Sequence, residues 1–294
     1  MDFRRDNSTI VLNFVGAHEE LPCLYPTQDV NYHLYEVENE PSLEEYSRYI
    51  CRHIIYDWTD FQQGIRSRFP AVFEINTELP VSNTHPLASP LSVVSALLTS
   101  AVRNSGRFPI LAVFCASPLI RSRVRASPVQ LTLGLIGQLM DFISRRRPRV
   151  PLAAVIALNR GLYSGANHNV GDGLEFLTEL LLALPSGDTV FIVIDRIRYL
   201  NSTDNGNDHI ALAAGLRRLV GRISDHLNLK LVVTGSWYFE PYNLDCHGVR
   251  HYARLVRAQG VGPALIDVIR YRMAIEEGWI RDLPSAGSGS SWHT

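Results

Sequence analysis

The sequence predicts an α/β protein built on a parallel sheet flanked by helices. Four short apolar runs, rich in β-branched and aromatic side chains, alternate with longer segments of helical periodicity. Strands that are buried on both faces have this composition, and they occur mainly in parallel sheets covered by helices. The four runs are 71–75, 109–115, 190–194 and 229–234.

Residues 1–69 are predicted to form an N-terminal segment with one strand and one helix. The strand covers Ile10–Val15, and an acidic, irregular stretch follows over residues 17–40. A capping-box pattern begins at Ser42, so we expect a helix from about Leu43 to Ile65.

Residues 70–248 are predicted to form the α/β core. Helical periodicity between the strands covers Leu91–Val102, Val129–Ser144, Leu174–Leu184 and Ile210–Leu227. Proline, glycine and small polar residues predict loops over Asn76–Pro90, 116–127, Gly161–Gly173, Asn201–Asp208 and 238–248. The apolar segment Pro151–Leu158 fits either a helix or a strand.

The end of the chain is predicted to be a helical extension over residues 249–283. Its helix would run from Val249 to Gly278 with a break near Gly260–Pro263. Residues 284–294 have the composition of a flexible tail.

Composition narrows the function classes. The 294 residues carry a net charge of −1, which gives no electrostatic argument for nucleic-acid or membrane binding. Four widely spaced cysteines without a CxxC pair, and the absence of a secretory signal or a long apolar run, predict a cytoplasmic protein. Lys230 is the only lysine in the chain.

The order of elements resembles a known family. Strand, loop, helix, strand, long helix, Asp-ending strand, helix and Thr-ending strand follow one another over about residues 70–240. This order is similar to the P-loop NTPase core of the NACHT and related (STAND-type) signal-transduction ATPases, particularly the short forms common in fungi. Val190–Asp195 resembles the Walker B strand, Leu229–Thr234 the sensor strand, and Ala112–Cys115 an FFF-like strand. The resemblance implies a P-loop NTPase-like three-layer sandwich.

Several positions depart from the family pattern. A Walker A loop needs glycines and a lysine to surround the phosphates, but Asn76–Pro90 contains neither. Aligning the helix start puts Leu91 at the lysine position and Ser92 at the hydroxyl position. The acids expected after Asp195 are replaced by Arg198 and Tyr199, and Gly235-Ser236-Trp237 replaces the sensor arginine. Because phosphoryl transfer depends on these groups, we predict a degenerate, inactive domain without catalytic residues.

The candidate site residues are Ser92, Asp195 and Thr234. The resemblance implies that they are a vestigial nucleotide site, with Asp195 as a vestigial Mg²⁺ ligand. The alternative is structural: Asp195 caps the turn after its strand, while the two hydroxyls lie at a helix start and a strand end. We expect no bound cofactor, with ATP and Mg²⁺ as the alternative.

Three functions remain open from the sequence. The leading one is an inactive binding or regulatory module for an unknown protein partner. The second is an NTPase with an unorthodox phosphate site that uses Arg121, Arg123 or Arg125. The third is an unrelated α/β hydrolase with Cys115 as nucleophile. The basic run Arg145–Arg149 fits phosphates, an acidic partner or plain solvation.

Overall fold

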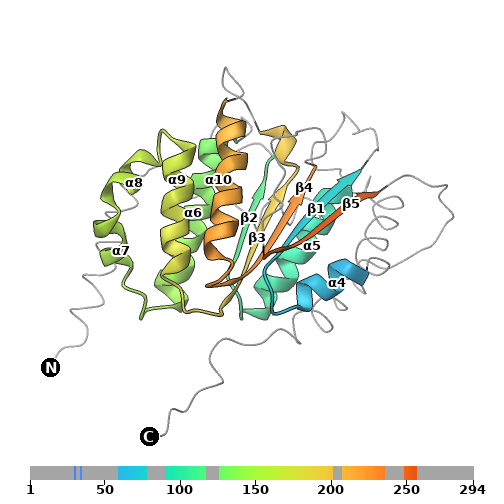
Figure 1. Ribbon diagram of the computed structural model, residues 1–294, viewed down its shortest axis with the longest axis horizontal. Coiled ribbons are helices and arrows are strands. Elements are labelled where there is room, and N and C mark those ends of the chain that lie inside the picture. Colours follow the sequence, from blue (N-terminus) through green and yellow to red (C-terminus); the bar gives the residue numbers. More distant parts are fainter. Residues whose placement is uncertain are drawn as a thin grey trace, which may run out of the picture.

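The fold is a parallel five-stranded sheet between two helical layers. The computed structural model describes Val30, Leu34 and residues 59–77, 90–116, 126–200, 207–235 and 248–256. In these parts the strand order is β2-β3-β4-β1-β5 and every pairing is parallel (Figure 1). The strands are β1 Ala71–Thr77, β2 Ile110–Phe114, β3 Thr189–Asp195, β4 Asn228–Thr234 and β5 Arg250–Val256. The predicted parallel α/β sheet is confirmed.

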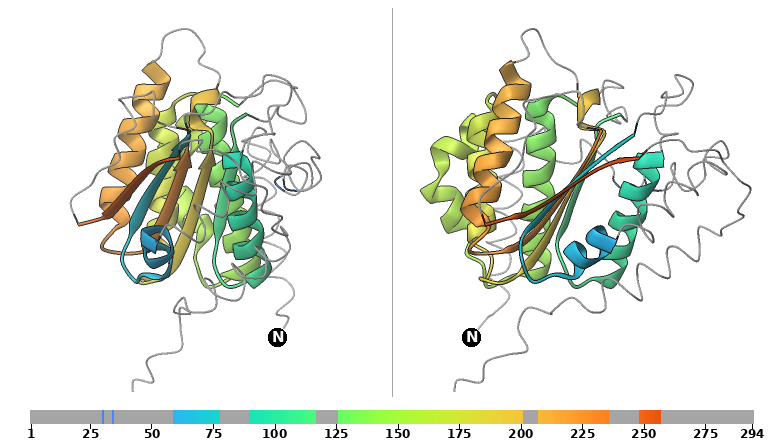
Figure 2. Two further views of the ribbon diagram at one scale, coloured as in Figure 1. Left: turned by 90° about the vertical axis from the view of Figure 1, so that its right-hand side faces the viewer. Right: turned by 45° about the vertical axis from the view of Figure 1, so that its right-hand side comes forward.

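The connections explain why helices cover both faces. The chain passes from β1 across the sheet to β2 through helix α5 (Pro90–Ser105), then returns strand by strand to β3 and β4. Parallel crossovers are right-handed in nearly all proteins, so reversing direction moves the connecting helices to the other face. The helices on that other face are α6 (Pro128–Arg146), α9 (Val170–Leu182) and α10 (Asn207–Ile223). Figure 2 shows these three helices across the sheet from α5.

Two apolar cores lie on the two faces of the sheet. Side chains alternate between them along each strand: Val72 and Leu231 face the α6–α9–α10 layer, whereas Phe73 packs on the other side. That second core includes α5 and helix α4 (Thr59–Arg66), together with the buried Val30 and Leu34. Part of the predicted N-terminal segment therefore packs on the sheet.

The prediction of a loop over Gly161–Gly173 is wrong. Helix α8 (Arg160–Gly165) follows α7 (Leu152–Leu158), and α9 begins at Val170. Asn169 caps α9 because its Oδ1 accepts the Gly171 N–H at 2.7 Å. A Cβ on Gly173 would lie 2.7 Å from Cγ2 of Thr132, so this glycine permits close packing of α9 on α6. The ambiguous segment Pro151–Leu158 is helical.

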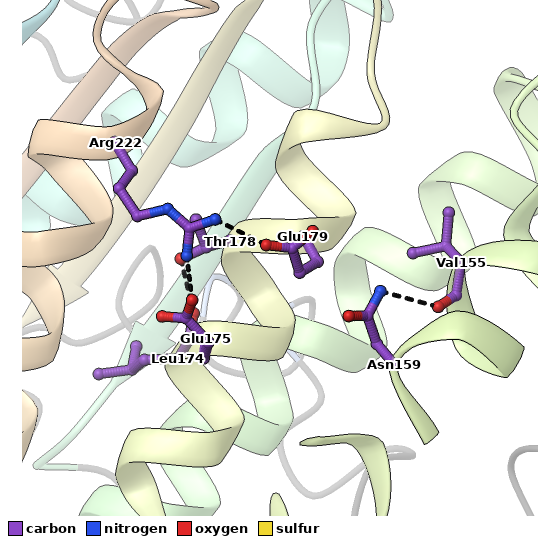
Figure 3. Close-up of polar contacts among 7 residues, drawn as sticks. All are labelled: Val155, Asn159, Leu174, Glu175, Thr178, Glu179 and Arg222. Carbon is purple, nitrogen blue, oxygen red and sulfur yellow. Dashed lines mark hydrogen bonds and ion pairs between the residues drawn. The ribbon is translucent and has the colours of Figure 1, made fainter. Parts of the chain in front are cut away.

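An ion-pair bridge joins α9 and α10 at the surface. In Figure 3, the Arg222 guanidinium on α10 reaches two acids one turn apart on α9, Glu175 and Glu179. Its Nη2 lies 2.7 Å from Oε1 of Glu179. The same view shows Thr178 and Asn159 each donating a side-chain hydrogen bond to a backbone carbonyl within its own segment. Exposed ion pairs of this kind contribute little to the stability of the fold, so the two helices are held together mainly by their buried apolar faces.

The predicted C-terminal helix is wrong at its beginning. Residues 250–256 form β5, which pairs in parallel with β1 from Ala71↔Arg250 onward. Pairing with β1 satisfies backbone groups that a helix would satisfy internally, so tertiary context decided between the two conformations. The sheet thus extends past residue 248.

The other predicted elements follow the structure closely where it describes them. The α4 residues confirm the end of the predicted helix Leu43–Ile65, and the helices and strands between Ala71 and Thr234 begin and end within a few residues of the expected positions. Outside the described residues lie the strand Ile10–Val15, most of the four remaining predicted loops and the tail. In the described part, no helix has the length and apolarity to cross a membrane.

Candidate functional site

The three predicted site residues meet at the carboxyl edge of the sheet. Asp195 ends β3, Thr234 ends the adjacent β4, and Ser92 lies in the first turn of α5, the helix that follows β1. In open α/β sheets ligands bind at this edge, where the connections switch from one face to the other. These three residues therefore lie at the edge where proteins with such sheets usually bind their ligands.

Hydroxyl groups occupy both oxygens of the Asp195 carboxylate. Ser92 Oγ donates to Oδ2 at 2.7 Å, while Thr234 Oγ1 and Ser95 Oγ donate to Oδ1 at 2.8 and 2.9 Å. All four residues have a relative exposure of 0%. We call Ser92, Ser95, Asp195 and Thr234 the Asp195 cluster.

Ser95 was not among the predicted site residues, although the sequence contains a signal for it. Ser92, Ser95 and Thr99 are spaced i, i+3 and i+7, and the other residues between Leu91 and Thr99 are apolar, so the three form one polar stripe. All three are fully buried, and Thr99 Oγ1 donates to the Ser95 carbonyl at 2.7 Å. A polar stripe on a helix that is buried all round predicts internal hydrogen bonds.

Arg196 was also missed, and it lies directly beside the cluster. Its backbone is left-handed, with φ of 53°, and its N–H donates to Thr234 Oγ1 at 2.8 Å. Gly235 makes room for this turn, since a Cβ there would be 3.2 Å from the Arg196 Cα. The guanidinium carbon of Arg196 lies 3.9 Å from the centre of the Tyr199 ring, and the residue as a whole is 1% exposed.

Burial raises the pKa of Asp195. The Ser92 hydrogen bond, the Arg196 charge and the other two hydroxyls favour the ionised form and offset part of this rise. The hydrogen bonds thus fix the position of the carboxyl group, while its burial disfavours the ionised form.

Cys115 lies next to the cluster as a buried thiol. Its N–H donates to the Asp195 carbonyl at 3.0 Å. Burial, with the Asp195 charge adding to it, raises the pKa of Cys115 well above its ordinary value. A nucleophilic cysteine needs the thiolate, so these surroundings oppose the hydrolase role.

The Asp195 cluster does not fit a Mg²⁺–nucleotide complex. Mg²⁺ requires octahedral oxygen ligands and usually keeps several waters, whereas this carboxylate has no exposed surface and accepts three protein hydroxyls. Among the residues that the structure describes, no three His, Cys, Asp or Glu side chains are grouped to hold a metal ion.

The only lysine of the sequence, Lys230, makes its hydrogen bonds away from the Asp195 cluster. Lys230 lies four residues before Thr234 on β4, about 13 Å away along the strand. Its buried Nζ donates to the carbonyls of Gly64, Ser67 and Phe69 at 2.7, 2.9 and 2.7 Å, at the end of α4. Lys230 therefore holds α4 onto the sheet. The arginines proposed for an unorthodox phosphate site, Arg121, Arg123 and Arg125, lie outside the described residues.

Comparisons with known proteins identify no family. No protein-family description, no curated protein and no solved structure matches this chain. The fold class itself, a parallel α/β sheet of the Rossmann or P-loop-like kind, rests on the observed topology.

Proposed function

We propose that this chain is a catalytically inactive, P-loop NTPase-like domain that acts as a binding or regulatory module. The observation that carries the proposal is that both oxygens of Asp195 accept hydrogen bonds from buried hydroxyls, three in all. In P-loop NTPases, the corresponding acid and the loop hydroxyl hold Mg²⁺. Here Ser92 and Asp195 hydrogen bond to each other inside the protein, so the pair stabilises the fold.

The positions of Lys230 and Arg196 support the same proposal. Phosphate binding in this fold needs a lysine beside glycine-rich backbone, and the only lysine is bound to the end of α4. Arg196, the nearest described cation to the carboxylate, is buried against Tyr199. A protein lacking these groups would still offer a stable α/β surface to a partner, which is the role we assign to it within a NACHT- or STAND-like lineage.

Titration calorimetry with Mg·ATP and Mg·GTP tests the proposal. We expect no binding heat for the wild-type protein, and unchanged traces for Asp195→Asn. The matched control is Asp188→Asn. Asp188 is a buried acid just before the other end of β3, where its Oδ2 pairs with Arg147 at 2.9 Å. Circular dichroism would verify that both variants are folded.

One observation favours a second candidate, Mg²⁺–nucleotide binding: the two group types that hold Mg²⁺ in P-loop NTPases lie 2.7 Å apart at the expected edge. Micromolar nucleotide binding that is lost in Asp195→Asn and kept in Asp188→Asn would establish this candidate and overturn the inactive-module proposal.

A further inference from the structure

A basic surface without acidic residues surrounds helix α7. Residues 142–171 contain five arginines and no Asp or Glu. Arg147 is paired with the buried Asp188, and Arg145 with Asp141 of its own helix. Arg146, Arg149 and Arg160 are exposed at the two ends of α7. We call α7 with these three arginines the basic α7 flank.

The helix between these arginines is apolar but mostly exposed. Every side chain of α7 (LAAVIAL) is apolar, yet only Leu152 is buried. Leu158 is 86% exposed, and its neighbours Ala153, Ala154 and Ala157 are exposed as well. In Figure 1, α7 and α8 lie at the outer side of the α9 layer, away from the sheet. A helix with apolar residues all round normally has a partner on each side.

The composition of the flank indicates what would cover it. Alanines allow the backbone of another protein segment to approach closely, and α7 has no aromatic side chain of the kind that anchors proteins in a lipid interface. The exposed arginines select an acidic partner. This chain itself carries such a segment: residues 17–40, the acidic stretch, contain six Asp and Glu and no Lys or Arg.

Two residues of the acidic stretch lie on the face of the sheet opposite α7. Val30 and Leu34, which belong to the acidic stretch, are buried in the core on the α4–α5 face. By contrast, the buried α7 residue Leu152 belongs to the core on the opposite face of the sheet. Because the sheet lies between the two cores, Val30 and Leu34 are on the other side of the sheet from α7 of the same copy.

We propose that the acidic stretch of one copy binds the basic α7 flank of a second copy, head to tail. Such an interface is heterologous, since two different surfaces meet, and it leaves one of each surface free at the ends of every assembly. Charge drives the contact, so screening by salt should weaken it. None of these residues belongs to the Asp195 cluster, so the proposal goes beyond the function proposed above.

Two charge-reversed variants test it by complementation. The flank variant carries Arg146→Glu, Arg149→Glu and Arg160→Glu. The stretch variant carries Glu36→Arg, Glu38→Arg and Glu40→Arg. Each variant keeps one intact surface. We therefore expect each alone to be monomeric in sedimentation equilibrium. An equimolar mixture should reach at least twice the monomer mass of 33.0 kDa, because the two reversed surfaces are also complementary in charge.

The wild-type protein should show a mass that rises with concentration at about 50 mM salt and returns to the monomer value at about 500 mM. A control with the same charge change on other exposed arginines, Arg107→Glu, Arg217→Glu and Arg218→Glu, should behave like wild type. Thermal unfolding by circular dichroism verifies the fold of each variant.

Three results would overturn the proposal. The first is a wild-type protein that stays monomeric at low salt, and the second is a mixture of the two variants that stays monomeric. The third is equal loss of association in the control, which would mean that general charge and not this flank drives it. Binding of the monomer to phosphatidylserine vesicles, lost in the flank variant, would instead assign the flank to a membrane surface.

Discussion

Replacing Lys230 by methionine is the sharpest test of how the only lysine is used. Methionine has a similar length and no charge, so it fills the same space and removes the donor to three carbonyls at the end of α4. A buried acceptor left without a partner costs about 1–3 kcal/mol, and removing a buried ammonium returns part of that cost. We expect Lys230→Met to lower the free energy of unfolding by about 2–4 kcal/mol at pH 7.

The pH dependence of this loss follows from the pKa. Burial, with the Arg250 charge adding to it, lowers the pKa of Lys230 to about 7. The unfolded chain keeps this proton up to about pH 10.4. Between these values the unfolded state binds more protons, so the stability of the wild type rises with pH by about 1.4 kcal/mol per unit. The methionine variant lacks this contribution, so the difference between the two proteins widens above pH 7 and is constant below it.

Two measurements check the reasoning. Lysine labelled with ¹³C at Cε gives a single lysine side-chain signal in this protein, and its shift should titrate with a midpoint near pH 7. Urea unfolding of the wild type and of Lys230→Met, compared at several pH values above 7, gives the difference in free energy. A midpoint that stays near the ordinary lysine value, with a constant difference between the proteins, would refute the argument. It would mean that the oxygen acceptors around Nζ outweigh burial.

Three further predictions concern the carboxyl edge. Burial raises the pKa of Asp195, so the folded state holds this proton more tightly than the unfolded chain, and stability falls as pH rises through the range above about 3.9. The melting temperature of Asp195→Asn should therefore rise relative to that of the wild type as the pH is raised from acid to neutral. Ser92→Ala and Ser95→Ala each remove a donor to the buried carboxylate and should each cost about 1–3 kcal/mol in urea unfolding; no loss in either would contradict the hydrogen bonds. Gly235→Ala should cost more than Gly187→Ala, because both have positive φ but only Gly235 has backbone within 3.2 Å; equal losses would deny that contact.

The sheet was predictable because its signal is local. The run that forms β3 is short, rich in β-branched and aromatic residues and bounded by turn signals, and these features together distinguish a buried strand from a buried helix. The family resemblance singled out Ser92, Asp195 and Thr234. They converge because the carboxyl ends of neighbouring parallel strands and the following helix starts share one edge of the sheet.

The misread segments depend on contacts between distant residues. Gly165 and Gly173 suggested a loop, but a Cβ on Gly173 would lie 2.7 Å from the buried Thr132 side chain, so this glycine is explained by close packing of α9 on α6. Nothing in the propensity of a glycine reveals its neighbour across an interface. For β5, the pairing partner lies almost 180 residues earlier in β1, and this distant pairing decided against a helix.

The Asp195 cluster and Arg196 are best understood as one unit. A non-glycine residue in the left-handed region costs about 1–2 kcal/mol, so Arg196 needs compensation. Thr234 provides it, since its hydroxyl accepts the Arg196 N–H and donates its own proton to the carboxylate. The strained turn thereby brings a cation to a buried acid, and Tyr199 covers that cation. Strained residues often mark ligand sites. Here the carboxylate and hydroxyls that a ligand would need are hydrogen bonded to one another, which is why we propose that this edge stabilises the fold and look for recognition at the basic α7 flank.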